Sequence, residues 1–318
     1  MSQLFPDIKR VCIFGVGGVG GYFGGRFAER IDNCRPYNYQ VYFIARGEHL
    51  RAIKNHGIKV ITPERVITGI PTKATNDISE TPPFDLLLLC VKAYDLDEAV
   101  ESINSKICET TTIIPLLNGV DIYERIRMKL KKGIVLPACI YIGTHIERPG
   151  VINQNGGSGR IIFGRDPQFP QFEGQTVKTF FKDMGIPFVW QNDPFPAIWE
   201  KYLFISAFGL VSASTGSSLG QIMENMELRD QVRSIMGEII SVAKKKSVVF
   251  PENSIEQSLK KASSFPYETR SSYQRDVENK GKNNEGDLYG GTIIREGAAL
   301  GIPTPMTESV YKIIQRLN

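Results

Sequence analysis

The chain has 318 residues, of which 42% are hydrophobic and 23% are charged. This length and composition are typical of a globular protein with two domains, and they exclude a disordered or fibrous chain. The net charge of +4 is small and dispersed, so we expect no nucleic-acid partner.

Cysteine usage and apolar runs predict where the protein works. The five cysteines are odd in number and lack CxxC spacing, which favours reduced thiols over a disulfide framework or a metal site. They are Cys12, Cys34, Cys90, Cys108 and Cys139. The first ten residues lack the apolar core of a signal peptide, and no apolar run is long enough to span a bilayer. We therefore expect a cytoplasmic protein with no membrane partner and no metal.

Short apolar runs alternate with helical patterns in the first half of the chain. We predict strands at 9–14, 40–44, 84–90 and 111–116, and helices at 20–29 and 95–103. Strands that are apolar on both faces and separated by helices indicate a parallel sheet covered on both sides. Residues 134–163 then predict antiparallel strands around a glycine-rich turn, followed by a helix at 175–184 and a strand at 186–190.

The segment 191–196 contains two prolines after polar residues, which is typical of a boundary. Helical patterns follow at 197–211, 223–245, 254–263, 285–300 and 307–317. The sequence from Ser254 to Gln257 has the form of a capping box. We therefore predict an α/β Rossmann-type dinucleotide-binding domain at 1–192, followed by an all-α domain for substrate binding or dimerisation at 193–318.

The glycine-rich stretch GVGGVG, residues 15–20, follows a predicted strand and opens a predicted helix. In this context GxGxxG predicts dinucleotide binding, whereas a glycine-rich turn without a ligand is the weaker alternative. Gly15 allows the tight turn, Gly17 lets a pyrophosphate approach the backbone, and Gly20 lets helix and strand pack closely. Gly18 and Val19 complete the loop, where the helix N-terminus offers N–H groups to an anion.

The residues after the second predicted strand indicate which dinucleotide binds. NAD-specific folds place a carboxylate there, against the ribose 2′-hydroxyl group. This chain has Ile44-Ala45-Arg46-Gly47 instead, so Arg46 could bind a 2′-phosphate, with help from Arg51. Lys92 follows another predicted strand and could contact the same phosphate or the adenine. The pattern favours NADP(H), with an ordinary surface arginine as the alternative.

Two polar residues are candidates for chemistry. Lys201 lies in a helix that is apolar nearly all round, so its ammonium group must pair, extend to solvent or face a cavity. A lysine with a lowered pKa could protonate a carbonyl oxygen, although the pattern by itself favours extension to solvent. Asn118 precedes Gly119 after a predicted parallel strand, which is typical of a turn. At this edge of the sheet Asn118 could also hydrogen bond to substrate or nicotinamide.

Eight motifs in order resemble the ketopantoate reductase (2-dehydropantoate 2-reductase) family. They are GVGGVGG with Arg46, VKAYD from Val91, LLNGVD from Leu116, RPGVI from Arg148, IWEK ending at Lys201, SSYQRD from Ser271, NNEGDLYGG from Asn283 and GIPTP from Gly301. The resemblance covers nearly the whole chain. It implies an NADP-dependent oxidoreductase that reduces a 2-oxo acid, with ketopantoate reduced to pantoate in pantothenate biosynthesis.

The resemblance also implies roles for particular residues. Lys201 matches the family's general acid, and Glu285 matches the carboxylate that binds the developing hydroxyl group. Ser272 matches the serine that holds the substrate carboxylate. Asn118 matches the asparagine between nicotinamide and substrate, so Asn118 and Glu285 are expected to contact cofactor as well.

Two departures put the substrate in question. The family's helix carries asparagines one and two turns after the lysine, where this chain has Ile205 and Gly209. The segment before Glu285 is also one residue longer than usual. A reductase for a more apolar 2-oxo acid is therefore an alternative, as is a non-catalytic NADP(H)-binding regulator. The helical domain could in addition form a homodimer.

Overall fold

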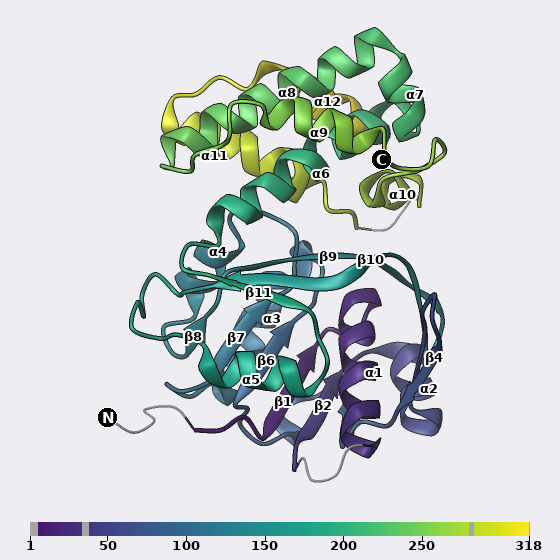
Figure 1. Cartoon of the computed structure of the whole chain (residues 1–318), viewed down its shortest axis with the longest axis vertical. Helices are drawn as coiled ribbons and strands as arrows, with labels where there is room; N and C mark the ends of the chain where they lie inside the picture. The colour runs from purple at the N-terminus through teal and green to yellow at the C-terminus, as the bar shows by residue number, and fades with distance from the viewer. Residues whose placement is uncertain (1–5, 34–37, 280–282, 318) are drawn as a thin grey trace. The chain divides into compact units, whose positions relative to one another are not determined.

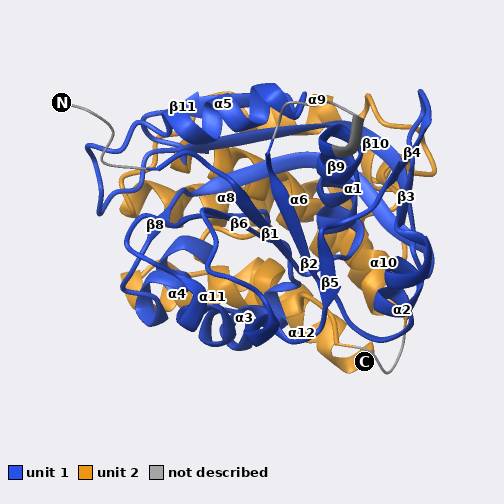
Figure 2. Ribbon diagram, turned by 90° about the horizontal axis from the view of Figure 1, so that it is seen from below, with its two compact units in different colours: residues 1–117, 122–194 blue, residues 118–121, 195–318 orange. Residues whose placement is uncertain are grey.

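The computed structural model describes residues 6–33, 38–279 and 283–317. The chain forms two compact units, coloured separately in Figure 2. Unit 1 comprises residues 1–117 and 122–194, and unit 2 comprises residues 118–121 and 195–318. The units divide after Pro194, and the short segment 118–121 belongs with the C-terminal helices. The domain boundary after residue 192 remains a prediction.

Unit 1 contains a parallel six-stranded sheet (Figure 1). Its strands are β1 (Arg10–Phe14), β2 (Gln40–Ile44), β5 (Lys73–Thr75), β6 (Leu86–Leu89), β7 (Thr112–Pro115) and β8 (Ile134–Val135). The strand order β5-β2-β1-β6-β7-β8 is that of a Rossmann fold, in which the chain starts in the middle and winds outward in both directions. The predicted parallel sheet is confirmed, and β6 is buried on both faces as its four leucines require.

Helices follow most of these strands, as a parallel sheet demands. They are α1 (Gly18–Asn33), α2 (Gly47–His56), α3 (Leu96–Ile103) and α4 (Ile122–Lys129). A further helix of unit 1, α5 (Gln175–Asp183), follows later in the chain. Glycines on α1 bring this helix close to both sheets of unit 1. A Cβ atom on Gly24 would lie 2.7 Å from the Phe43 ring, and one on Gly25 would lie 2.5 Å from Val60. The small face of α1 is thus used for packing.

A second sheet in unit 1 has the order β11-β10-β3-β4, with β9 paired to β10. Its strands are β3 (Ile58–Ile61), β4 (Val66–Gly69), β9 (Ala138–Arg148), β10 (Val151–Gly164) and β11 (Phe188–Gln191). The predicted antiparallel pair is present, but the prediction of a glycine-rich turn is wrong. The turn occurs at Gly150, where φ is +78°, and Gly156 lies inside β10 at a register irregularity. The extra glycines therefore shape a strand.

Unit 2 is helical, which confirms the predicted class of the C-terminal half. Its helices are α6 (Phe195–Thr215), α7 (Leu219–Glu224), α8 (Met226–Lys245), α9 (Ser254–Ala262), α10 (Ser272–Glu278), α11 (Thr292–Leu300) and α12 (Pro305–Leu317). A π-helical turn, η4 (Asp287–Gly291), precedes α11, so the predicted helix at 285–300 is two elements. The predicted capping box at Ser254 is wrong: the Ser254 hydroxyl group donates to the Pro251 carbonyl, and the capping box is formed by Ser218 and Gln221.

Cys12, Cys90, Cys108 and Cys139 are thiols outside any disulfide bond within the described part of the chain, and Cys34 lies outside it. Within residues 6–33, 38–279 and 283–317, no helix is long and apolar enough to cross a membrane. In the same ranges, no three His, Cys, Asp or Glu side chains group as metal ligands would.

Candidate functional site

The glycine-rich loop joins β1 to α1 through a tight turn at Gly15, where φ is +90°. The N–H groups of Gly15 and Val16 both donate to the Ile44 carbonyl at 3.1 Å, which fixes the loop against the end of β2. A Cβ atom on Gly20, in the first turn of α1, would lie 2.2 Å from the Gly15 carbonyl oxygen, so any larger residue there would displace the backbone. Apart from Gly17 itself and its two chain neighbours, no described residue has an atom within 4 Å of the position that a Cβ atom on Gly17 would occupy. That open space is where a dinucleotide fold admits pyrophosphate.

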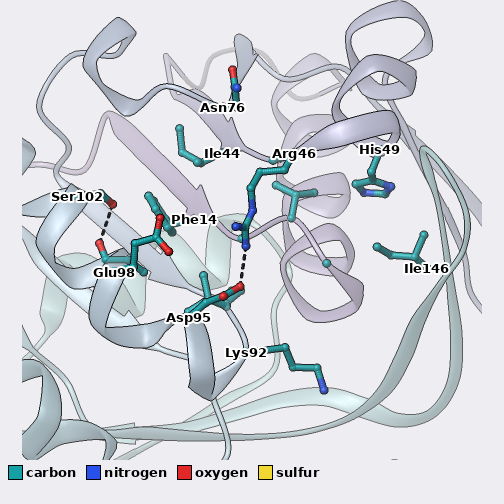
Figure 3. Close-up of a pocket in the computed structure, with 17 residues that line it drawn as sticks. Phe14, Ile44, Arg46, His49, Asn76, Lys92, Asp95, Glu98, Ser102 and Ile146 are labelled. Carbon is teal, nitrogen blue, oxygen red and sulfur yellow. Dashed lines mark hydrogen bonds and ion pairs between the residues drawn. The ribbon is translucent and has the colours of Figure 1, made fainter. Parts of the chain in front are cut away.

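A cavity of about 350 Å³ opens beside this loop in unit 1 (Figure 3), within the size range of small-molecule sites. The loop and the segments that follow β2, β5 and β6 form its wall, with three residues from α3 and one each from α2 and β9. Among the predicted cofactor residues, Gly15, Gly17, Arg46 and Lys92 line the cavity. Gly18, Val19 and Gly20 form the first turn of α1. Arg51 lies on α2, 3.9 Å from the Glu48 carboxylate.

Arg46 forms an ion pair inside this cavity that the sequence pattern did not predict. Its Nη2 atom lies 2.6 Å from the Asp95 Oδ2 atom, and both side chains line the wall (Figure 3). Arg46 is 71% exposed and Asp95 28% exposed. Asp95 ends η2 (Ala93–Asp95), the 3-10 turn after β6. Only the pairing of β2 and β6 with β1 brings these two residues together, so local sequence carries no signal for the contact.

His49 is a second cavity residue that sequence reasoning missed. The Gly150 N–H group donates to its Nδ1 atom at 3.0 Å, which places the proton of the neutral ring on Nε2. Within the described residues, this buried Nε2 atom has no hydrogen-bond partner. Burial lowers the pKa of His49 below its ordinary value of 6.5. His49 therefore brings a neutral N–H donor to the cavity wall.

Unit 2 holds the predicted chemical residues. The Lys201 Nζ atom donates to the Asn118 Oδ1 atom at 2.6 Å, although the two residues are 83 positions apart in sequence. Asn118 opens the segment 118–121, and Gly119 turns it with φ of +120°. Lys201 is half-buried on α6. The fold thus supplies the polar partner that a lysine on an apolar helix requires.

Ser272 and Glu285 belong to segments that pack against α6, at α10 and η4. Ser272 is exposed at the start of α10, and its hydroxyl group lies 3.2 Å from the Tyr289 hydroxyl group. Glu285 is only 6% exposed and lies two residues before the start of η4. The longer segment expected before Glu285 falls partly on residues 280–282, which lie outside the described residues.

The departures at 205 and 209 have a structural counterpart in Tyr289. A Cβ atom on Gly209 would lie 3.3 Å from the Tyr289 ring, so this ring fills the space beside the glycine. Tyr289 also stacks on Tyr273, with ring centroids 4.7 Å apart. Its hydroxyl group thereby reaches Ser272, while Ile205 leaves an apolar, half-buried surface one turn after Lys201. Positions 205 and 209 thus carry no amide side chain, and Ile205 and the Tyr289 ring lie beside this part of α6.

A nucleotide-sized cavity at a GxGxxG loop, on a sheet of Rossmann order, defines a dinucleotide-binding fold, here followed in the chain by an all-helical unit. Two family models match the chain. Residues 11–168 match ketopantoate reductase PanE/ApbA, and residues 195–318 match the ketopantoate reductase PanE/ApbA C-terminal model. The chain belongs to the ketopantoate reductase family and is an oxidoreductase of that family.

Individual relatives agree with this assignment. The chain is 28% identical to the uncharacterized oxidoreductase YkpB of Bacillus subtilis, with 95% of this chain and 97% of the relative covered. It is 25% identical to a 2-dehydropantoate 2-reductase of Mesorhizobium japonicum, with 97% of each chain covered. A PanE/ApbA family ketopantoate reductase structure from Ralstonia eutropha superposes with a TM-score of 0.86 at 27% identity, covering 97% of this chain and 98% of that one.

Proposed function

We propose that this protein reduces a 2-oxo acid to a 2-hydroxy acid with NADPH, and that its substrate is ketopantoate, which becomes pantoate. The observation that supports this reaction best is the hydrogen bond of 2.6 Å between Lys201 and Asn118. It holds an ammonium group, which is both a proton donor and a positive charge, at a fixed point, and both residues match site residues of the family. A relative's name supports the choice of ketopantoate.

The cavity of unit 1 suits NADPH on two grounds. The space in front of Gly17 leaves the backbone open to a pyrophosphate, and the first turn of α1 offers N–H groups to it. Arg46 follows β2 at the position where NAD-specific folds carry a carboxylate, so a guanidinium group is present for a 2′-phosphate. Lys92 adds a second positive charge to the wall.

Bound NADPH would supply the hydride, and the chain's own residues supply the remaining chemistry. During this reduction Lys201 would donate a proton to the carbonyl oxygen as the carbonyl bond becomes a carbon–oxygen single bond. Its charge stabilises the developing alkoxide because Asn118 already fixes the Nζ atom. Ser272 would donate to the substrate carboxylate. Glu285 would accept from the new hydroxyl group, and Lys201 then regains a proton from water.

A second candidate substrate is a more apolar 2-oxo acid. Ile205 favours it, because a half-buried isoleucine one turn after Lys201 offers no hydrogen bond to a polar substrate. A site that lacks polar partners discriminates poorly in favour of polar groups. A non-catalytic NADP(H)-binding regulator is the third candidate, and the Lys201–Asn118 pair argues against it. A cytoplasmic location and a homodimer through the helical unit remain predictions.

The test measures NADPH oxidation with a panel of 2-oxo acids. The reaction is monitored as the decrease in absorbance of the reduced nicotinamide. Lys201→Ala should lower kcat by roughly 10²- to 10⁴-fold, the usual contribution of a positioned general acid. Lys245→Ala is the matched control, because Lys245 is exposed near the end of α8. Preferred turnover of ketopantoate supports the first candidate, and preferred turnover of another acid supports the second. Tight NADPH binding without turnover on any acid would overturn both.

A further inference from the structure

The Arg46–Asp95 ion pair lies where the adenine-side ribose of a dinucleotide binds in a Rossmann fold, beyond the carboxyl end of β2. Arg46 reaches this place from the end of β2. Asp95 reaches it from the turn after β6, the strand on the other side of β1. A carboxylate is therefore present at the ribose position, although β2 itself ends without one.

A carboxylate here affects the two nicotinamide cofactors in opposite ways. It can accept a hydrogen bond from a free ribose hydroxyl group, as the acid after β2 does in NAD-specific folds. Toward a 2′-phosphate it is a like charge, and it already occupies the guanidinium group that would bind that phosphate. The pair is partly exposed, so salt and water screen this repulsion without removing it.

We propose that Asp95 is a specificity-determining residue that lowers the discrimination between phosphorylated and unphosphorylated ribose, so that the chain binds NADH as well as NADPH. The proposal rests on the proposed binding of a nicotinamide dinucleotide in this cavity. In this proposal the ability to bind NADH depends on Asp95, which follows β6 rather than β2. Arg46 supplies the attraction for phosphate, and Asp95 limits it.

The test is isothermal titration calorimetry on the full chain with adenosine 2′,5′-bisphosphate and adenosine 5′-monophosphate. These probes differ by the 2′-phosphate and lack nicotinamide, so their binding does not depend on hydride transfer. Asp95→Asn should tighten binding of the bisphosphate by about tenfold, or 1.4 kcal/mol. Its affinity for the monophosphate should be unchanged or weaker. Asp97→Asn is the matched control: it makes the same charge change at an exposed residue that pairs with Arg125.

The outcomes separate this proposal from the proposed function. Bisphosphate binding that is unchanged or weaker in Asp95→Asn would overturn the role of Asp95 while leaving dinucleotide binding intact. An equal gain in Asp97→Asn would assign the effect to net charge and overturn the proposal as well. If the wild-type chain bound neither probe nor NADPH in a fluorescence titration, the proposed function itself would fail.

Discussion

Gly17 and Gly20 belong to one loop, yet a methyl group would have opposite consequences at the two positions. In Gly17→Ala the new Cβ atom enters open space, so the free energy of unfolding should stay within about 0.5 kcal/mol of wild type. NADPH affinity should fall about tenfold or more, because the methyl group occupies the space for the pyrophosphate. Urea denaturation and a fluorescence titration with NADPH measure the two effects.

Gly20→Ala provides the comparison. Its Cβ atom would lie 2.2 Å from the Gly15 carbonyl oxygen, and the backbone cannot move away without disturbing β1. We expect the free energy of unfolding to fall by about 1–3 kcal/mol, as for other overpacked sites. Equal losses of stability in both variants would contradict the separate roles of these glycines.

His49 predicts a pH dependence of stability. Burial lowers the pKa of His49 below 6.5 in the folded chain, so below about pH 6.5 the unfolded chain binds the proton more readily. Stability should therefore fall as the pH drops through this value toward the pKa of the folded state. His49→Asn retains an acceptor for the Gly150 N–H group but cannot titrate, so its urea midpoint should fall less on acidification. His56→Asn, at an exposed histidine on α2, should behave like wild type.

Helix α6 and the π-helical turn η4 are tied by buried hydroxyl groups. Tyr202 donates to the Leu288 carbonyl at 2.7 Å and to the Tyr289 carbonyl at 3.0 Å, and Ser206 donates to the Tyr289 carbonyl at 2.6 Å. A π turn widens the helix and frees carbonyl groups from their usual partners. Tyr202 and Ser206 satisfy those groups and so hold the turn that follows Glu285 against the helix that bears Lys201.

Tyr202→Phe should therefore destabilise the protein although it removes only one oxygen atom. The Leu288 carbonyl would lose its donor in a buried place, at a cost of about 1–3 kcal/mol in the free energy of unfolding. Tyr267→Phe is the control, since the Tyr267 hydroxyl group is exposed and bonded to Glu224. In thermal denaturation the melting temperature of Tyr202→Phe should be well below that of Tyr267→Phe. Equal melting temperatures would show that the Tyr202 hydrogen bonds do not contribute to stability.

Elements whose signal is local could be predicted from sequence, and those that depend on distant partners could not. The strand, turn and helix around Gly15 follow from neighbouring residues alone. The hairpin of β3 and β4 was missed because its short strands are stabilised by β10 and α1. The glycines at 156–159 predicted a turn, because a glycine-rich composition does not distinguish a turn from an irregularity within a strand.

The candidate site divides in the same way. Arg46 was predicted from its place after β2, whereas its partner Asp95 was not, because the contact depends on the strand order of the sheet. Lys201 was a candidate because it lies in an apolar helix, but that pattern alone favoured a side chain that extends to solvent. The resemblance to a family was needed to favour chemistry, and only the fold pairs Lys201 with Asn118.

At the scale of the whole molecule, each unit contains one of the two tryptophans, Trp190 in unit 1 and Trp199 in unit 2. Trp199→Phe leaves a reporter for unit 1, and Trp190→Phe leaves one for unit 2. Since the cavity is formed by unit 1, NADPH at a hundred times its Kd should stabilise that unit by about 2.7 kcal/mol. Fluorescence-detected melting of Trp199→Phe should show a higher Tm with NADPH, and an absent shift would contradict binding in this cavity.

The path of the chain through unit 2 sets an order of events during synthesis. The segment 118–121 belongs to unit 2, yet it is made before β8 to β11 and well before α6. At 5–20 residues per second, Asn118 leaves the ribosome roughly 4 to 17 s before Lys201, which follows it by 83 positions. The nascent chain must therefore complete most of unit 1 with this segment still unassembled. A fragment that begins at residue 195 would contain every helix of unit 2 and still lack the amide that positions its lysine.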